Sequence, residues 1–599
     1  MNIIPQPKEI NLGKKLNTKI YNENLICTNA GQSLVSYITS KIDAEVRYLN
    51  EGGCYFIEIG TGEYKKDKDL EEIYKSKKEA YYLSVSSEKI FISSPSEQGL
   101  FYGFQTYMQL SEQMCDNEIE IIDWPDNTLR GFHLELRYGM PKFERLLEIV
   151  DEIAKYKFNT LVIEYENRFP YSDYKDIIAK HALTEEQLNT LLAYAKNRYL
   201  EVIPLQQTLG HLEYILKLEK YNNLKEVKED IYTELPFSFN GVGFKHFNSI
   251  DELCVTNEQA YKMIENLCTD IISKHKESNF IHIGCDEAWN LLSCSSCQEK
   301  YGKDGAKRLY IDHINRMAGL VKNANKVPII WDDMLRSFDD EDFQMLDKDI
   351  VLMCWLYFEH NYELGCKLIS KYKKSGFKVI GASAAKCSEG INPLYLDMPY
   401  MDERLGNIQA WSKLSEEFEL DGVVTTLWSN YTGTIAPPHP FFDTAWYPVV
   451  FSAEKYWNTK SEKDEFYDRF IREYFGVEPQ AGALSNNNQL SFKFFSKVSE
   501  ACKTNNYLAE VYKTMSLVSA YRIKSLAINR EVYKSLSDVT EEEKKLVEKR
   551  IREVVNMREY IKPIIKELLS KNYVEEDVEE FMNSRFGLDE LIYEHILNG

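Results

Sequence analysis

The sequence predicts an α/β protein centred on a (β/α)₈ barrel, with a small N-terminal α+β domain and a C-terminal helical domain. Three observations support this prediction. Residues 1–125 show strand-like alternation followed by a helical pattern, residues 126–460 alternate short β-branched runs with helical segments, and residues 461–599 carry long amphipathic patterns without strand signals. We therefore expect three domains with these boundaries.

The N-terminal prediction depends on local periodicity. Residues 79–86 and 89–93 alternate apolar and polar side chains as half-buried strands do, and residues 99–110 have the spacing of a helix. A small accessory domain of mixed strands and helix follows from these segments.

Eight apolar runs in the middle region predict the barrel strands. They cover residues 129–136, 159–164, 200–206, 279–285, 327–332, 350–355, 378–384 and 422–428. Helical segments separate them, as crossover helices separate parallel strands. A doubly wound open sheet would alternate in the same way, but no Gly-x-Gly-x-x-Gly follows the first strand, so a TIM barrel is favoured.

The C-terminal prediction depends on helical spacing alone. Residues 509–536 and 540–569 repeat Leu, Ile and Val at helical intervals among Lys and Glu. Such stretches are typical of packed amphipathic helices.

Composition narrows the class of ligand. The chain has 72 Lys and Arg against 94 Asp and Glu, a net charge of −22, which argues against nucleic acid and anionic membranes as partners. No apolar run approaches the roughly 18 residues of a membrane span, and the N-terminus lacks an export signal pattern, so we expect a cytoplasmic protein. An aromatic content of 13% suits sugar-binding surfaces and ordinary cores equally.

The twelve cysteines fit reduced thiols that fill space in a cytoplasmic protein better than a disulfide framework. Cys294 and Cys297 form one closely spaced pair. A zinc site needs two further ligands, and no second pair of comparable spacing is present. We therefore expect a solvent-side loop there, and no metal or cofactor.

The run from Phe280 to Trp289 ends an apolar strand in two adjacent carboxylates, Asp286 and Glu287. Active sites of barrels form at the carboxyl ends of their strands, which makes this pair a candidate for chemistry. Two carboxylates this close do not ionise independently, so one can stay protonated as a general acid. The alternative is a solvated loop in which Asp286 caps the next helix.

The segment His282-Ile-Gly-Cys-Asp-Glu287 resembles the signature of family 20 glycoside hydrolases, the β-N-acetylhexosaminidases. Residues 79–86 with 99–106 resemble the family's accessory domain, residues 129–137 its first barrel strand, and Gly210-His211 its Pro-Gly-His turn. The similarity spans roughly residues 75–460, and it does not cover the helical tail.

The resemblance implies a substrate-assisted mechanism with retention of configuration, in which the 2-acetamido carbonyl of the sugar attacks C1 and forms an oxazolinium ion. It assigns Glu287 as the acid/base and Asp286 as the carboxylate that orients the acetamide. It further implies that Arg130 binds distant hydroxyls, against the alternative of a structural ion pair. His282 and His211 match positions around the acid, although either suits a core, and Glu166 is a candidate sugar-binding group.

An apolar box for the acetamide methyl is implied at the strand ends that carry Trp331, Trp355 and Trp428. Any one of these tryptophans could instead fill the core. The tyrosine that donates to the acetamide carbonyl is assigned first to Tyr395, in a Tyr-x-Asp motif with Asp397, with Tyr357 and Tyr431 as rivals.

The sequence departs from the family pattern at Gln207, where many members have aspartate, at Cys285, and at Asn430, where a glutamate is usual. These changes leave sugar selectivity open. The leading hypothesis is an exo-acting enzyme that removes terminal β-linked GlcNAc or GalNAc. The alternatives are a catalytically impaired sugar-binding protein on the same barrel, or a glycosidase for another sugar. Whether the chain forms a homodimer is also open.

Overall fold

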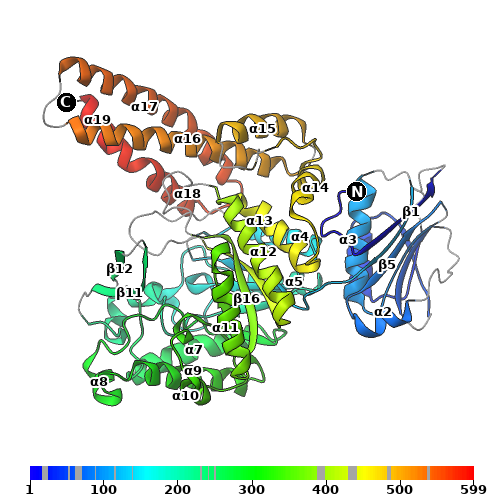
Figure 1. Ribbon diagram of the computed structural model, residues 1–599, viewed down its shortest axis with the longest axis horizontal. Helices are drawn as coiled ribbons and strands as arrows, with labels where there is room; N and C mark the ends of the chain where they lie inside the picture. Colours follow the sequence, from blue (N-terminus) through cyan, green and yellow to red (C-terminus); the bar gives the residue numbers. More distant parts are fainter. Residues whose placement is uncertain are drawn as a thin grey trace.

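The computed structural model describes the chain except for residues 17–24, 51–53, 61–69, 88, 114–116, 138, 229–231, 240–241, 248–250, 388–397, 429–441, 482–483, 485–487, 503, 536–539 and 599. Figure 1 shows a barrel at the centre, a separate sheet beside it and an arm of helices that projects away.

The centre is a closed barrel of eight parallel strands, which confirms the predicted fold. The strands are β8 (Arg130–Glu135), β9 (Thr160–Glu164), β10 (Glu201–Leu205), β13 (Phe280–His282), β14 (Val327–Trp331), β15 (Val351–Trp355), β16 (Lys378–Lys386) and β17 (Gly422–Leu427). All eight predicted runs form strands, because each is long enough and apolar enough to be buried on both faces.

Helices surround the barrel strands. The long ones are α4 (Phe143–Lys155), α5 (Glu185–Lys196), α7 (Glu258–Lys274), α9 (Ala306–Asn323), α11 (Tyr362–Lys374), α12 (Met401–Phe418) and α13 (Trp446–Trp457). Shorter elements lie in the connections: α6 (Glu213–Leu216), the hairpin of β11 (Tyr232–Phe239) and β12 (Val242–Phe247), α8 (Ser295–Tyr301) and α10 (Asp340–Met345).

The N-terminal region is a seven-stranded sheet in the order β1-β7-β5-β6-β4-β2-β3. Its strands are β1 (Glu9–Lys15), β2 (Leu25–Thr28), β3 (Glu45–Tyr48), β4 (Tyr55–Gly60), β5 (Tyr81–Val85), β6 (Lys89–Ser94) and β7 (Asn117–Asp123). The described part of this region also contains the helices α1 (Gln32–Thr39), α2 (Glu71–Ser76) and α3 (Glu97–Glu112), of which α3 is the longest.

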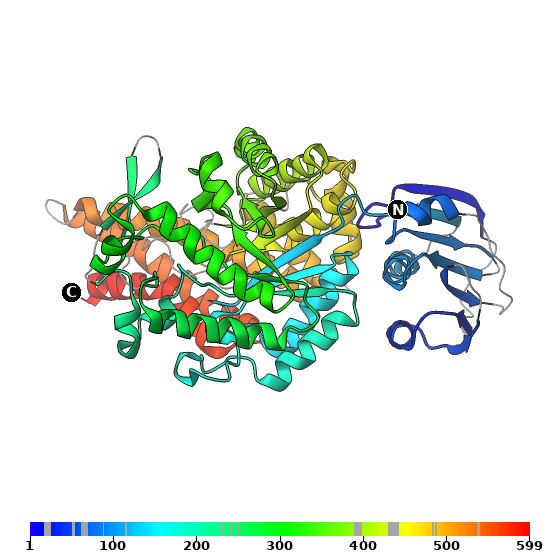
Figure 2. The ribbon, with the colours of Figure 1, turned by 90° about the horizontal axis from the view of Figure 1, so that it is seen from below.

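This sheet docks on the amino ends of the barrel strands, as the view in Figure 2 makes clear. Lys157, just before β9, contacts Asp123 at 3.2 Å and donates to Tyr81 Oη at 2.9 Å. Asp123 also accepts from Trp457 Nε1 at 2.9 Å. A buried polar network thus joins the N-terminal sheet to the amino ends of the barrel strands.

The C-terminal region consists of α14 (Lys463–Phe475), α15 (Asn488–Ala501), α16 (Asn506–Ser535), α17 (Glu541–Leu569), α18 (Glu575–Met582) and α19 (Leu588–Asn598). The start of α18 lies against the loop after β8, where Met140 N–H donates to Asp577 Oδ2 at 2.5 Å. Arg168, after β9, approaches Asp577 Oδ1 at 3.3 Å. The helical region therefore borders the carboxyl-end rim of the barrel.

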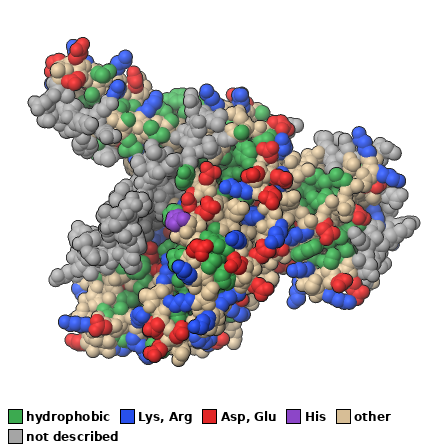
Figure 3. Space-filling model, viewed as in Figure 1, with side chains coloured by type: hydrophobic (Ala, Val, Ile, Leu, Met, Phe, Trp, Pro, Cys, Tyr) green, Lys and Arg blue, Asp and Glu red, His purple; other side chains and the backbone are tan. Residues whose placement is uncertain are grey.

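Within the described ranges, each helix falls short of the length and apolar character needed to cross a membrane. One face of the surface, shown in Figure 3, mixes acidic and basic side chains over the barrel.

Candidate active site

Asp286 and Glu287 follow β13 at the carboxyl end of the barrel. The Glu287 N–H donates to Asp333 Oδ2 at 2.9 Å, and Asp333 comes just after the neighbouring strand β14. Cys285 (φ 71°) and Glu287 (φ 49°) both have left-handed backbone, which strains non-glycine residues and is concentrated at functional sites. The surrounding structure therefore holds this turn in a backbone conformation that non-glycine residues disfavour.

His211 faces both carboxylates. Its Nε2 lies 3.4 Å from Asp286 Oδ2 and 3.5 Å from Glu287 Oε2. Burial would lower the pKa of His211, but Asp286, Glu287 and Asp251 outweigh it and raise the pKa well above its ordinary range. The imidazole is therefore charged at neutral pH and joins the two acids into one cluster.

Asp333 is a third carboxyl group in this cluster. Its Oδ1 accepts from Trp355 Nε1 at 3.1 Å, while its Oδ2 receives the Glu287 N–H. Burial and the nearby charge of Asp286 raise the pKa of Asp333 to about 8. A neutral Asp333 thus positions the backbone of Glu287 and one indole without adding charge at neutral pH.

Arg137, two residues beyond the end of the first barrel strand, is an arginine of this rim. Its Nε lies 2.6 Å from Glu166 Oε1 and 3.2 Å from Glu135 Oε1, and its Nη2 lies 3.0 Å from Glu164 Oε1. Burial acts to raise the pKa of Glu164, but Arg137 and His133 outweigh it and lower that pKa. For Glu166, burial and repulsion from Glu164 outweigh Arg137 and raise the pKa.

Arg130 lies at the opposite end of the same strand, so its predicted role at the sugar is wrong. It is 1% exposed, contacts Glu79 of the N-terminal region at 2.6 Å and donates to the carbonyls of Lys157 and Asn127. Its guanidinium also lies over the Trp457 ring. The alternative of a structural ion pair is the correct one, because Arg130 begins β8 and the site is at the end of the strand.

Aromatic rings gather beside the acid cluster. Trp331 and Trp428 have ring centroids 5.8 Å apart, Tyr357 lies 6.3 Å from Trp428, and Trp355 stacks on Tyr357 at 5.0 Å. Among the described residues, the buried Nε1 atoms of Trp331 and Trp428 have no hydrogen-bond partner. We call these four rings the aromatic cage.

His282 connects the cage to the acids. Its ring lies 4.6 Å from that of Trp331, and its Nδ1 accepts from the Gly284 N–H at 3.0 Å. Burial lowers the pKa of His282 to about 3, so the ring is neutral and carries its proton on Nε2. That nitrogen, like Asp286 Oδ1, has no partner within the described part of the chain.

The structure therefore brings together most of the predicted site residues at one rim: Asp286, Glu287, His211, His282, Glu166, Trp331, Trp355 and Trp428. Tyr395 and Asp397, with Tyr431 and Asn430, lie outside the described residues.

Two members of the rim were missed by sequence reasoning. Arg137 stands in the same run as Arg130, and the rule that sites form at carboxyl ends would have selected it. Asp333 follows the strand that ends in Trp331, and the same rule applies to it. Gln207, noted as a departure, donates to Glu164 Oε1 at 3.0 Å and so belongs to the carboxylate network.

Comparison with known families matches residues 128–460 to the glycosyl hydrolase family 20 catalytic domain and residues 1–124 to domain 2 of the same family. The chain belongs to glycosyl hydrolase family 20. It is therefore a glycoside hydrolase of the β-N-acetylhexosaminidase family, with the barrel and accessory sheet in the arrangement described above.

Similar proteins include Hexosaminidase D of Bos taurus, which is 27% identical over 316 residues, covering 51% of this chain and 85% of the relative. Hexosaminidase D of Homo sapiens is 27% identical over 320 residues, or 51% of this chain and 60% of the relative.

Solved structures share the fold. The β-N-acetylhexosaminidase from Bacteroides fragilis matches with a TM-score of 0.58 and 18% identity, covering 79% of this chain and 94% of that one. A chitobiase from Flavobacterium johnsoniae matches with a TM-score of 0.58 and 16% identity, covering 100% and 93%.

Proposed function

We propose that this family 20 chain is a retaining, exo-acting β-N-acetylhexosaminidase that removes terminal β-linked GlcNAc or GalNAc from glycans or glycoconjugates. The observation that carries the proposal is the convergence of Asp286, Glu287 and charged His211 beside the aromatic cage. Its hexosaminidase relatives support the same class of substrate.

In the proposed reaction the acetamide carbonyl oxygen of the substrate attacks C1, and Glu287 donates a proton to the departing glycosidic oxygen. The C1–O bond breaks and an oxazolinium ion forms. Glu287 then takes a proton from water, which opens the ring with retention of configuration. The protein supplies no nucleophile.

Asp286 would hold the acetamide during both steps. Its Oδ1 is buried and has no partner among the described residues, so it can accept the acetamide N–H. The negative charge of Asp286 would also balance the positive charge that develops on the oxazolinium ion. His211, which approaches Oδ2, fixes the orientation of this carboxylate.

The aromatic cage would receive the acetamide methyl, since its indole faces exclude water. We assign the hydroxyls far from the scissile bond to Arg137 and Glu166, in place of Arg130. Tyr357, whose ring is part of the cage, becomes a candidate donor to the acetamide carbonyl beside Tyr395. Tyr395 and its neighbour Asp397 stay predictions.

The same site argues against a protein that only binds sugar. A binding protein needs the cage and the hydroxyl ligands, but it has no use for a strained Glu287 beside a charged imidazole. We also propose a cytoplasmic location, which is supported by the eleven described cysteines, since none of them forms a disulfide.

Replacing Glu287 by Gln tests the proposal. We expect kcat for an aryl N-acetyl-β-hexosaminide with a poor leaving group to fall by about 10²–10⁴, because the leaving oxygen loses its proton donor. An activated aryl substrate, whose phenolate leaves without help, should lose much less. Steady-state kinetics on both substrates measure this difference.

Glu363→Gln, an exposed carboxylate on α11, is the control and should retain wild-type rates. Equal losses on both substrates would exclude a general acid at Glu287. Efficient cleavage of a substrate without the 2-acetamido group would contradict participation by the substrate. A thiazoline analogue of the bicyclic intermediate should inhibit the wild type tightly.

A further inference from the structure

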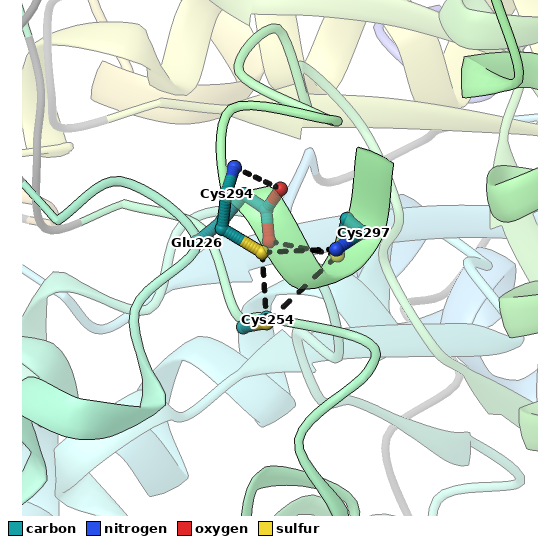
Figure 4. A group of neighbouring side chains, drawn as sticks. All are labelled: Glu226, Cys254, Cys294 and Cys297. Atoms are coloured by element: carbon teal, nitrogen blue, oxygen red, sulfur yellow. Dashed lines mark hydrogen bonds between the residues drawn. The ribbon is translucent and has the colours of Figure 1, made fainter. Parts of the chain in front are cut away.

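Four buried side chains outside the acid cluster come together in a group of thiols and one carboxylate, shown in Figure 4: Glu226, Cys254, Cys294 and Cys297. Each is at most 6% exposed. The expectation of a solvent-side loop at Cys294 and Cys297 is therefore wrong. The two missing ligands are present, but they come from separate loops and not from a second closely spaced pair.

The distances suit a small tetrahedral ion. Cys254 Sγ lies 3.5 Å from Cys294 Sγ and 3.8 Å from Cys297 Sγ, and Cys297 Sγ lies 3.2 Å from Glu226 Oε2. Bonds of about 2.3 Å to sulfur and about 2.0–2.2 Å to oxygen place tetrahedral ligand atoms roughly 3.5–3.8 Å apart. One ligand atom from each of the four residues lies within 4.8 Å of the others.

The backbone around the group is arranged to support ligands. Cys294 caps the N-terminus of α8, and its Sγ accepts from the Cys297 N–H at 3.3 Å. The Cys294 N–H donates to Glu226 Oε1 at 3.1 Å, which turns the other carboxylate oxygen toward Cys297. Hydrogen bonds of this kind orient ligands and stabilise thiolates.

Two plainer explanations account for the group less well. Thiols that merely fill space, such as the equally buried Cys268 on α7, do not need a buried carboxylate as neighbour. A disulfide would join two sulfurs and leave the third thiol and Glu226 without a role. Sulfur separations of 3.5 and 3.8 Å allow hydrogen bonds between thiols and also fit three thiolates around one ion, and they exceed the roughly 2.05 Å of a disulfide.

We propose that Glu226, Cys254, Cys294 and Cys297 bind one structural Zn²⁺ ion. Three thiolates with one carboxylate favour zinc over calcium or magnesium, which prefer all-oxygen sites. The four ligands close the coordination sphere, so the ion has a structural role and leaves no position for a substrate. Binding releases the thiol protons to solvent.

The ion would clamp the loops that hold the acid cluster. Cys254 belongs to the segment in which Asp251 accepts from the His211 N–H at 3.0 Å. Cys294 follows Glu287 by seven residues, and between them the Asn290 N–H donates to Glu252 Oε1 at 2.6 Å. Zinc would therefore connect the loop after β13, which carries Asp286 and Glu287, to the segment that supports His211.

Metal analysis of the full-length chain, purified without chelator or polyhistidine tag, tests the proposal directly. We expect about one zinc per chain in the wild type and less than about a tenth of that in Cys294→Ala and Cys297→Ala. Cys268→Ala removes an equally buried thiol on α7 and should keep its zinc. Cobalt substituted for zinc should show the visible absorption of a tetrahedral thiolate site.

Should either variant fail to fold, the wild type still decides the question. A strong chelator should release the zinc, lower the midpoint of thermal unfolding and expose three more thiols to a labelling reagent. Wild-type protein without bound zinc after growth and reconstitution in zinc would overturn the proposal. A mass lower by two hydrogens under non-reducing conditions would do so too, since it would indicate a disulfide. Zinc content is read without any assay of turnover, so this result is separate from the proposed hydrolase mechanism.

Discussion

Arg130 and Arg137 lie at opposite ends of strand β8 and serve different parts of the molecule. Arg137 is surrounded by carboxylates at the rim where substrate would bind, whereas Arg130 joins the barrel to the accessory sheet. Only Arg137 can meet a sugar hydroxyl, although the two arginines are only seven positions apart in the sequence.

Replacing each arginine by alanine should therefore separate the two roles by their effect on catalysis, although both variants should lose stability, because Arg137→Ala also leaves buried carboxylates without their cationic partner. Arg137→Ala should lower kcat/KM for an aryl N-acetyl-β-hexosaminide by about tenfold or more, because hydroxyl contacts to a charged donor are worth about 1.5–3 kcal/mol. Arg130→Ala should destabilise the fold by about 3–5 kcal/mol, because Glu79 loses its cationic partner and several backbone carbonyls lose their hydrogen-bond donor. The kcat/KM of the folded protein should be retained. Thermal unfolding and steady-state kinetics on both variants measure the two effects. A catalytic loss confined to Arg130→Ala would reverse the assignment.

Asp333 predicts a pH dependence of stability. Its pKa is about 8 in the folded chain and lies near the ordinary value of 3.8 when unfolded. Between these values the folded state holds a proton that the unfolded state has released, so the free energy of unfolding falls as pH rises from about 4 to 8. The slope from this one group is at most about 1.4 kcal/mol per pH unit.

Asp333→Asn removes that proton exchange and should flatten the decline. Chemical denaturation of wild type and variant at several pH values across this window gives the two slopes. Equal slopes would show that Asp333 is ionised in the folded protein at neutral pH.

At the scale of the element, the turn after β13 depends on Gly284. Its φ is +67°, and an added Cβ would lie 1.9 Å from Gln207 Oε1. Because Asp286 and Glu287 follow directly, any shift of this turn moves both acids.

Gly284→Ala should lower the midpoint of thermal unfolding and reduce kcat. The left-handed backbone alone costs about 1–2 kcal/mol in alanine, and displacement of Gln207 adds to it. Combining it with Gln207→Ala should restore part of the stability, since the side-chain overlap is gone while the backbone strain remains. Full wild-type behaviour in Gly284→Ala would mean that the turn can relax freely.

The positions of the barrel strands could be predicted from the sequence, whereas the contacts between loops could not. The eight barrel strands are buried apolar runs, and such runs are visible in one sequence. The zinc ligands and the partners of Arg130 come from segments far apart in the chain, and their proximity depends on the path of each loop. The acid pair was found because both members stand together. The prediction for Arg130 is wrong because the resemblance extends over the whole first strand, so it does not distinguish the arginine at the amino end from the one at the carboxyl end.

On the scale of the whole molecule, Asp443 joins the barrel to the helical region. It is fully buried and accepts from Arg145 Nη2 of α4 at 2.7 Å, Tyr573 Oη at 2.8 Å and Tyr507 Oη of α16 at 3.1 Å. Three parts of the chain therefore meet at one carboxylate.

Asp443→Ala should destabilise the protein by about 3–5 kcal/mol, because Arg145 loses its buried carboxylate and keeps only the exposed Glu148 as a partner. We also expect faster cleavage between barrel and helices in limited proteolysis, because the two tyrosine hydroxyls lose their acceptor. Asp443→Asn keeps an acceptor for the tyrosines and should show a smaller change in proteolysis. An unchanged cleavage pattern in Asp443→Ala would mean that other contacts suffice to hold the helices.

The left-handed backbone at His211 and Glu287, with φ of 54° and 49°, bears on how this chain can be improved by directed evolution. Glycine would adopt either conformation more easily than the residue now present. Selection for thermal stability alone would therefore favour replacement of these two side chains by glycine. The more stable variants would then lack hydrolase activity. A screen for stabilised variants therefore has to measure turnover and thermal stability in the same round.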